Sequence, residues 1–532
     1  MGILAWMFSS MDTTAATIIA GPGESGFRAA IAAAQPGDTV MLTNNVDLQA
    51  TVLIDKALTI RFGRPNVYYN AIRGNFEGAL LHLGSDGIVL ENVTLAGYGQ
   101  TDALRFQTNV VLRDCAIQDC RYPLVATDPY GLQGIVRLER VTVTRNQEGL
   151  GCVNLEAKDC TFSNNRGWGG VSGATVELDG CVIEGNHGTG LGLRNGAVKN
   201  CVIRYNTEFG LRFDPDNGYL RLKGCLFYAN AGGGAYLGEG GYVTVDNCTF
   251  TRHTGKWAVL VTTDAHDVSL RHCTVTDNVA VESDPLQWPP SGAFWIGSRA
   301  RLQNCLIADN PTSNDPNASG LVGDWIDEGG NVIGGPARLS PLRDNGGPTL
   351  SLLPLAGSPA IDAGRASDIV SDARGLSRLA GAAPDAGAIE TGAGPVADTD
   401  GDGIPDTWEQ LHGLDADDPA DASADSDGDG QNARAEFGSG TDPADRQSVH
   451  RTEEVRLSRT LLTWPFTRWG YNGYLTWTHR PGVFYHVEAS TDLRTWRRLP
   501  DTGMPDGSTI WLDLGQIEIN SPSTFYRVIA KK

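Results

Sequence analysis

Acidic residues recur at fixed offsets between residues 398 and 409, and their spacing carries a specific chemistry. The run Asp398-Thr-Asp-Gly-Asp-Gly-Ile-Pro-Asp-Thr-Trp-Glu409 places Gly403 at position 6 of a loop and the carbonyl of Ile404 at position 7. Side-chain oxygens stand at positions 1, 3, 5, 9 and 12, which are Asp398, Asp400, Asp402, Asp406 and Glu409. Calcium takes six to eight oxygens, and this spacing wraps them around one ion. The run therefore predicts a calcium-binding loop.

A second loop follows with the same offsets. Its acidic positions are Asp425, Asp427, Asp429 and Glu436, and the carbonyl of Gln431 stands at position 7. Position 9 is Ala433, so we expect a water molecule in that place. Residues 398–445 hold 15 Asp or Glu against Arg434 alone, and such a density of charge repels itself without a counterion. A disordered acidic linker is the alternative, but the fixed offsets in tandem favour two calcium sites.

A second candidate site, in the middle of the chain, would act on a polysaccharide. Counted from recurring asparagines, Arg194 and Arg212 take neighbouring places, and Arg212 alternates with Asp214 and Asp216. Later residues near the same edge are Glu239, Asp264 and His266, and the aromatic residues nearby are Trp168, Phe209, Tyr236 and Trp257. A polysaccharide lyase needs a base beside a sugar proton and cations that neutralise the adjacent carboxylate. The simpler interpretation is a solvated face with surface ion pairs.

The elements that must position these residues repeat down the chain. Each unit reads apolar-x-apolar-x-x-Cys-x-apolar-x-x-Asn, as from Val176 to Asn186. The cysteines are Cys115, Cys160, Cys181, Cys201, Cys225, Cys248, Cys273 and Cys305, and the asparagines are Asn165, Asn186, Asn206, Asn230, Asn278 and Asn310. Some units depart from this pattern. Val141 takes the cysteine position before Asn146, and Val93 takes it in a unit with Tyr98 at the asparagine position. Cys120 and His253 also occupy the asparagine position. A period near 20 residues with alternating strands and Gly-rich turns is typical of a solenoid.

A repeat this short cannot bury a face alone, so its units must stack. Cysteine suits a buried, stacked position, while asparagine tolerates left-handed backbone and can bond from one turn to the next. Metal ligation is disfavoured because no Cys-x-x-Cys pair occurs, and disulfides between neighbouring turns stay an alternative. The inward positions mix Val, Leu, Ile, Phe and Cys, which favours a β-helix over a leucine-rich repeat.

The start of the solenoid resembles a known fold. Phe27, Ala30, Ile31 and Ala34 fall on one helical face, with Ser25 as the expected N-cap, and Pro36-Gly-Asp38 ends the helix. Such a helix would cover the open apolar end of the first turn. Together with the asparagine turns, it resembles right-handed parallel β-helix proteins of the pectate-lyase type. We therefore predict an all-β, right-handed parallel β-helix with an N-terminal cap over residues 17–310.

Three later segments resemble other modules. Residues 311–396 resemble the choice-of-anchor Q family. Five short sequence motifs carry this resemblance: Gly329–Ile333, Asp344–Thr349, Gly357–Gly364, Asp372–Gly375 and Asp385–Glu390. That resemblance implies an extracytoplasmic β-helix body and no particular activity. Residues 397–446 resemble the calcium-binding repeats of thrombospondin type 3, which implies a stiff spacer. Residues 447–532 hold five of the twelve tryptophans and short alternating runs, which predict a β-sandwich. Ser490–Leu493 and Phe525–Val528 resemble fibronectin-III-like tail modules of bacterial exported proteins.

The bulk properties narrow the function. A net charge of −21 argues against nucleic acid and anionic membranes as partners. No stretch is long enough for a transmembrane helix, and the apolar start lacks the basic residues of a signal peptide. We expect a secreted or cell-surface protein that presents a face to an extracellular polysaccharide or cell-surface glycan on a calcium-stiffened stalk.

Two alternatives stay open: a polysaccharide lyase or hydrolase, and a structural or adhesive shaft. The sequence has no paired-carboxylate motif, zinc-protease motif or nucleophile elbow, which leans against an enzyme. The tryptophans of the last segment serve either core packing or a sugar-stacking surface. The sequence also leaves open the partner of this tail and the means of surface attachment.

Overall fold

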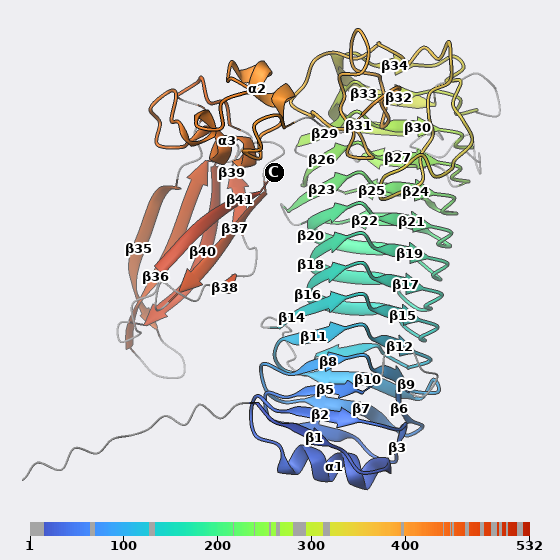
Figure 1. The fold of residues 1–532 in the computed structure, drawn as a ribbon, viewed down its shortest axis with the longest axis vertical. Helices are drawn as coiled ribbons and strands as arrows, with labels where there is room; N and C mark the ends of the chain where they lie inside the picture. Colours follow the sequence, from blue (N-terminus) through green and yellow to red (C-terminus); the bar gives the residue numbers. More distant parts are fainter. Residues whose placement is uncertain are drawn as a thin grey trace, which may run out of the picture. The chain divides into compact units, whose positions relative to one another are not determined.

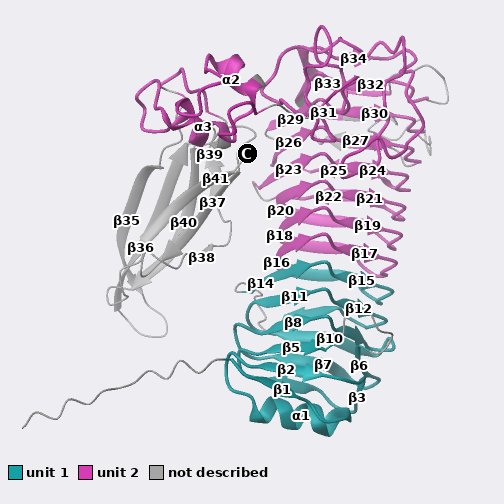
Figure 2. Ribbon diagram, in the orientation of Figure 1, with its two compact units in different colours: residues 1–152 teal, residues 153–532 magenta. Residues whose placement is uncertain are grey.

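The structure, a computed structural model, divides the chain into two compact units, residues 1–152 and residues 153–532 (Figure 2). It describes residues 15–63, 70–126, 134–215, 218–238, 240–254, 257–261, 267–279, 294–311, 320–394, 398–439, 441–446 and 448. Beyond these it describes only the backbone of the strands between residues 452 and 531.

The first unit begins with strand β1 (Thr17–Ile19) and helix α1 (Gly23–Ala33), which lies at one end of the unit (Figure 1). Phe27, Ala30 and Ile31 are buried, as the helical pattern predicted. The N-cap prediction was wrong. Pro22 occupies the N-cap without a side-chain bond, and the helix starts at Gly23, so Ser25 lies inside it.

Three parallel sheets run through the first unit, and each turn of the chain adds one strand to each sheet (Figure 1). The first sheet continues from β1 with β2 (Thr39–Leu42), β5 (Thr59–Phe62), β8 (Val89–Glu91), β11 (Val110–Arg113) and β14 (Ile135–Glu139). The second contains β3 (Val46–Leu48), β6 (Ala71–Gly74), β9 (Thr94–Ala96), β12 (Ala116–Gln118) and β15 (Thr142–Thr144). The third contains β4 (Val52–Ile54), β7 (Gly78–Leu83), β10 (Thr101–Phe106) and β13 (Leu124–Ala126).

The second unit continues the same parallel pattern after β16 (Leu150–Lys158), a strand that straddles the boundary. One sheet contains β18 (Val171–Asp179), β20 (Leu191–Lys199), β22 (Phe209–Phe213), β23 (Tyr219–Lys223), β25 (Gly233–Leu237), β26 (Tyr242–Asp246), β28 (Trp257–Val261), β29 (Asp267–Arg271), β31 (Phe294–Gln303) and β33 (Leu321–Gly329). The other contains β17 (Thr161–Ser163), β19 (Val182–Glu184), β21 (Val202–Arg204), β24 (Leu226–Tyr228), β27 (Thr249–Thr251), β30 (Thr274–Thr276), β32 (Leu306–Ile307) and β34 (Val332–Ile333).

The predicted column of thiols is confirmed in this unit. The amide of Cys181 donates to Sγ of Cys201 at 3.3 Å, and both residues are fully buried. The amides of Val182 and Val202 donate to the carbonyls of Cys160 and Cys181 at 2.8 and 2.9 Å, which fixes one cysteine above the next. All ten cysteines of the chain are free thiols. Burial raises the pKa of Cys115 in the first unit to about 12, so that thiol is neutral and unreactive at physiological pH.

The predicted asparagine ladder is confirmed as well. Oδ1 of Asn206 accepts from the backbone amide and the side-chain amide of Asn186 at 3.1 and 3.0 Å. Nδ2 of Asn206 donates in turn to Oδ1 of Asn230 at 2.9 Å and to the carbonyl of Ile183 at 3.2 Å. The expectation that these asparagines take left-handed backbone was wrong. That conformation belongs to the residue before each one, such as Tyr205 at φ 57° and Ala229 at φ 52°, because the sharp turn there aims the following side chain inward.

His253 fills the asparagine place on its turn, as predicted. Its Nδ1 accepts from the amide of Asn230 at 3.0 Å, and its own amide donates to Oδ1 of Asn278 at 3.1 Å. The other ring nitrogen faces the carbonyl of Phe227, where an asparagine would donate with Nδ2. The neutral imidazole thus replaces the acceptor of an amide, whereas its Nε2 makes no hydrogen bond within the described part of the chain.

The residues after β34 are irregular and pack against turns of the second unit through polar bonds. Nη2 of Arg378 donates to Oδ1 of Asn247 at 2.7 Å, and the amide of Ala388 donates to Oγ1 of Thr274 at 2.9 Å. Two carboxylates tie the loops together: Oδ1 of Asp362 accepts from the amide of Ala382, and Oε2 of Glu390 accepts from the amide of Asp385, both at 2.7 Å.

Residues 398–446 contain two short α-helices and one 3₁₀ turn around a small core. The elements are α2 (Asp406–His412), η1 (Asp421–Ser423) and α3 (Ala433–Ser439). The buried apolar residues of this core are Ile404, Trp408, Ala422 and Ala433.

The last segment forms two antiparallel sheets. One contains β35 (Thr452–Leu462), β36 (Arg468–Thr478), β39 (Gly503–Asp506) and β40 (Thr509–Glu518). The other contains β37 (Phe484–Ser490), β38 (Arg497–Arg498) and β41 (Phe525–Lys531). The two interpretations of its tryptophans lie outside the described side chains.

Candidate functional site

Four strands of the second unit bring one outward position into line. Ser172 of β18 pairs with Gly192 of β20, Gly192 pairs with Arg212 of β22, and Arg212 pairs with Tyr236 of β25. Alternation along each strand puts neighbours such as Leu191, Leu211 and Phe213 in the core. The aligned residues therefore share the outer face of the sheet, about 4.8 Å apart from one strand to the next.

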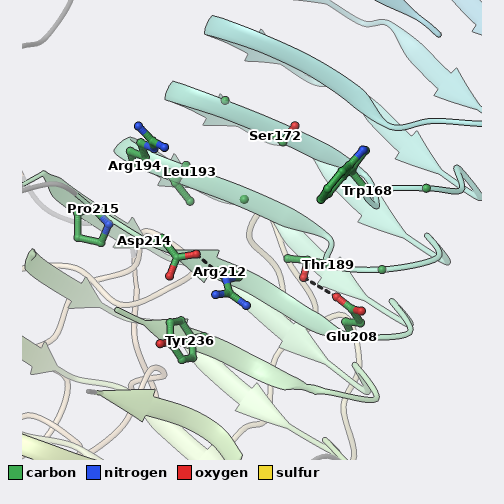
Figure 3. A pocket seen from close by; sticks show the side chains of 14 residues that line it. Trp168, Ser172, Thr189, Leu193, Arg194, Glu208, Arg212, Asp214, Pro215 and Tyr236 are labelled. Carbon is green, nitrogen blue, oxygen red and sulfur yellow. Dashed lines mark hydrogen bonds and ion pairs between the residues drawn. The ribbon is translucent and has the colours of Figure 1, made fainter. Parts of the chain in front are cut away.

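A groove of about 920 Å³ lies over this row of residues (Figure 3). It is lined by Gly167, Trp168, Ser172, Gly173, Gly188, Thr189, Gly192, Leu193, Arg194, Glu208, Arg212, Asp214, Pro215 and Tyr236. Glycines hollow it out. A Cβ placed on Gly192 would lie 3.9 Å from its nearest neighbour, Cβ of Ser172, so the space above that strand is open.

Charged and aromatic side chains surround this glycine floor. Nε of Arg212 donates to Oδ2 of Asp214, and this bond raises the pKa of Arg212, which stays a cation. The guanidinium of Arg212 also lies 5.0 Å from the ring centre of Tyr236. Oγ1 of Thr189 donates to Oε2 of Glu208 at 3.1 Å. Trp168 is 83% exposed, so most of its indole surface faces solvent.

The first acidic loop gathers its carboxylates. Oxygens of Asp398, Asp400 and Asp402 lie within 4.8 Å of one another, which matches the diameter of a calcium coordination sphere. One oxygen of Asp400 and one of Asp402 accept from the amides of Asp402 and Ile404 at 3.1 and 2.7 Å. The second oxygens of both carboxylates are buried and have no hydrogen-bond partner within the described part of the chain. The residues present therefore fit a cation.

Glu409 gives the clearest indication that the first loop fits a cation. Its side chain is fully buried, and neither carboxylate oxygen has a hydrogen-bond partner among the described residues. Burial, together with the negative charges of Asp402 and Asp400, raises its pKa to about 7. A buried carboxylate without a partner is costly unless a cation neutralises it.

The second loop repeats this arrangement. Oxygens of Asp425, Asp427 and Asp429 lie within 4.8 Å of one another, and Asp425 accepts from the amide of Gly430 at 2.9 Å. Glu436 is fully buried, and burial with the charges of Asp429 and Asp427 raises its pKa to about 7. Both loops thus bring acidic oxygens to one point from positions 1, 3 and 5.

Comparison with known proteins places the main body in a family. The family model of the right-handed β-helix region matches residues 58–196 and 168–333, which together span just over half of the 532 residues. The chain belongs to the right-handed β-helix family. No curated protein sequence matches this β-helix chain. Within the described residues, no helix is both long and apolar enough to cross a membrane.

Solved structures give more distant likenesses to the β-helix chain. A pectate lyase is 12% identical over 72% of this chain and 97% of its own, with a TM-score of 0.31. A PL6 family alginate lyase is 14% identical over 63% and 55%, with a TM-score of 0.38. The A-module of a mannuronan C-5 epimerase from Azotobacter vinelandii is 14% identical over 57% and 94%, with a TM-score of 0.34. At these identities and scores the likenesses carry no conclusion about activity.

The predicted polysaccharide patch of the β-helix is brought together in part. Arg194, Arg212 and Asp214 line the groove with Trp168 and Tyr236. Phe209 instead contacts Tyr236, with ring centres 5.8 Å apart. Asp216, Glu239, Asp264 and His266 lie outside the described residues, and their roles stay predictions.

The sequence analysis of this β-helix missed Thr189 and Glu208. A signal for both exists, because Thr189 stands three residues after ladder residue Asn186, as Trp168 stands three after Asn165. Glu208 precedes the equivalent position of the next turn by one residue. Counting from the ladder would therefore have placed both beside Trp168.

The predicted calcium ligands of this β-helix protein are placed as follows. Asp398, Asp400, Asp402, Asp425, Asp427 and Asp429 form the two clusters, Glu409 and Glu436 are buried, and Ile404 and Gln431 follow the two position-6 glycines. Asp406 has other partners: its carboxylate accepts from the amide and Oγ1 of Thr399 at 2.7 and 2.6 Å. Calcium binding by these residues stays a prediction.

Proposed function

We propose that the protein acts outside the cytoplasm and that the groove over β18, β20, β22 and β25 binds a polysaccharide or cell-surface glycan. The observation that carries the proposal is the glycine-floored groove with exposed Trp168 at its side and the Arg212–Asp214 pair within it. Sugar rings present apolar faces and many hydroxyl groups. An exposed indole can stack on such a face, and a guanidinium–carboxylate pair can donate to and accept from hydroxyls.

The charge of the groove favours a hydroxyl-rich ligand over a highly charged one. Its lining holds two arginines, Arg194 and Arg212, and two carboxylates, Glu208 and Asp214. This balance offers both donors and acceptors without a strong net field, which suits neutral or weakly acidic sugars.

Affinity electrophoresis with acidic and neutral polysaccharides tests the proposal. Wild-type protein should be retarded by at least one polymer, and Gly192→Phe should abolish the retardation because a ring there fills the groove. Gly394→Phe is the control, since a Cβ at Gly394 meets nothing within 4 Å and lies away from the groove lining. Trp168→Ala should weaken binding without changing thermal stability. If all three variants bind like wild type, the groove is not the binding site.

The same incubation tests the alternatives. Release of unsaturated or reducing sugar ends would make the protein a lyase or hydrolase. Absence of retardation by any polymer would favour a structural or adhesive shaft.

We further propose four regions: the capped β-helix over residues 17–310, its choice-of-anchor Q-like end over 311–396, a calcium-stiffened spacer over 397–446, and a fibronectin-III-like sandwich over 447–532. Two observations support calcium in the spacer: the clustered oxygens of both acidic loops, and the carboxylate of Glu409, which has no hydrogen-bond partner among the described residues. Calorimetric titration should give calcium uptake that Asp400→Ala combined with Asp427→Ala removes. Unchanged uptake in the double variant would exclude these loops.

A further inference from the structure

We infer that Asp421, outside both twelve-residue loops, supplies a ligand to the first calcium site. The inference rests on the proposed calcium binding and extends it, because it makes the connection between the loops a part of the first site. The carboxylate oxygens of Asp421, Asp402 and Glu409 lie within 4.8 Å of one another.

The first loop lacks one of its expected ligands, and Asp421 can replace it. Position 9 of the loop is Asp406, but both oxygens of that carboxylate accept hydrogen bonds from Thr399, at 2.7 and 2.6 Å. Calcium needs at least six oxygens, so a side chain from outside the loop can complete the sphere.

The carboxylate of Asp421 is set up to bind in this way. Its Oδ2 accepts from the amide of Asp415 at 2.7 Å, which fixes the side chain in place. Its Oδ1 is buried and has no hydrogen-bond partner among the described residues. A carboxylate oxygen of Asp421 belongs to the cluster that contains Glu409, which is fully buried and has no hydrogen-bond partner for its carboxylate among the described residues. Three carboxylates so close together repel one another unless a cation lies between them.

The position of Asp421 in the chain couples the two loops. It opens the 3₁₀ turn η1, and Asp425, the first residue of the second loop, follows four residues later. The amide of Ala424 donates to the carbonyl of Asp421 at 2.8 Å, so the turn is continuous up to the second loop. A cation that holds Asp421 therefore fixes the start of the second loop, and filling the first site should favour filling the second.

The test is calcium titration of the full chain by calorimetry, with Asp421→Asn in an Asp427→Ala background so that the first site is measured alone. Asparagine keeps an acceptor for the amide of Asp415 but removes the charge. We expect the calcium affinity of the first site to fall about tenfold or more. Asp421→Ala should lower it further, and circular dichroism with excess calcium checks that each variant is folded.

Asp418→Asn in the same background is the matched control. It removes one charge from the same connection. Asp418 is exposed, and its side chain accepts a local bond from the amide of Ala420 at 3.0 Å. Equal affinities for the Asp421→Asn and Asp418→Asn proteins would overturn the inference while leaving calcium binding intact. If the Asp427→Ala protein binds no calcium at all, the first site itself is refuted.

Discussion

In the second unit, the side chains of Asn186, Asn206 and Asn230 are buried and form a chain of hydrogen bonds, each to the next. In the acidic segment, the carboxylates of Asp402 and Glu409 are also buried, but they hold oxygens without hydrogen-bond partners in the described chain. Both regions bury polar groups, which is costly unless each group is satisfied. An amide carries its own donor and acceptor, so a stack of asparagines satisfies itself. Carboxylates only accept, so a cluster of them needs a cation.

The two regions also differ in their apolar cores. The turns of the second unit bury a continuous interior that includes Phe162, Phe213, Phe227 and Phe250, with the last two rings stacked at 4.6 Å. The acidic segment buries little beyond Ile404, Trp408, Ala422 and Ala433. Burial therefore stabilises the turns, whereas the proposed calcium ions would have to stabilise the acidic segment.

Removal of calcium should give the largest difference between the two regions, in the rate at which their backbone amides exchange with solvent. With a chelator, backbone amides of residues 398–439 should exchange with solvent far faster, because four to five carboxylates per loop then repel one another around a small core. Amides of residues 176–213 should keep their protection. Hydrogen exchange read by mass spectrometry measures both in one sample. Unchanged exchange in the acidic segment would show that its order does not come from an ion.

Replacement of Asn206 by Ala should give the next largest effect. The side chain makes four hydrogen bonds, with Asn186, Asn230 and Ile183, at 2.9 to 3.2 Å. At about 1 kcal/mol each, their loss should lower the free energy of unfolding by about 4 kcal/mol. Denaturant unfolding measures the change, with Asn44→Ala as the control because Asn44 is exposed and makes one side-chain bond, to Thr43. A loss no greater than that of the control would mean that the ladder does not stabilise the turns.

The sequence allowed the turns to be predicted because each turn repeats the surroundings of the last. Cys181, Cys201 and Cys225 mark one column, and the ladder residues five positions later mark another, so the fold follows from a one-dimensional count. The left-handed positions were misplaced because no residue type marks them: Gly185, Tyr205 and Ala229 all occupy that place.

Contacts outside the period could not be counted in this way. The bond from Arg378 to Asn247 joins residues 131 positions apart, and no repeat relates them. The sequence analysis did not include Asp421, the further ligand that we infer, for a similar reason: the spacing of a twelve-residue loop ends at Glu409. Sequence spacing therefore located the acidic loops and the groove face. Contacts with residues far away in the sequence could be identified only from the three-dimensional structure.

His253 allows the ladder to be weakened by acid alone. Burial lowers its pKa from about 6.5 to about 4, because a charged ring would be desolvated there. Its contribution to stability is therefore complete above pH 6.5 and is lost as the pH falls from 6.5 to about 4, which amounts to about 3 kcal/mol. Unfolding free energies of wild type and His253→Asn across this range should converge at neutral pH and separate in acid, with wild type the less stable. Parallel curves would show that His253 is not protonated on unfolding.

Replacement of Cys201 by Ala should give the smallest effect and thereby separates packing from bonding within the turns. The thiol is fully buried. Its Sγ donates to the carbonyl of Lys199 at 3.1 Å and accepts from the amide of Cys181 at 3.3 Å, and both bonds are weak. Loss of one sulfur atom resembles loss of one methylene group, so unfolding should become easier by about 1 kcal/mol. Cys152→Ala, at an only partly buried position, should change less in the same denaturant titration. Cys201→Ala could instead lower the free energy of unfolding as much as Asn206→Ala does. The column of thiols would then be a main source of stability. In that case the two regions would differ chiefly in how densely they are packed, and not in how their buried polar groups are satisfied.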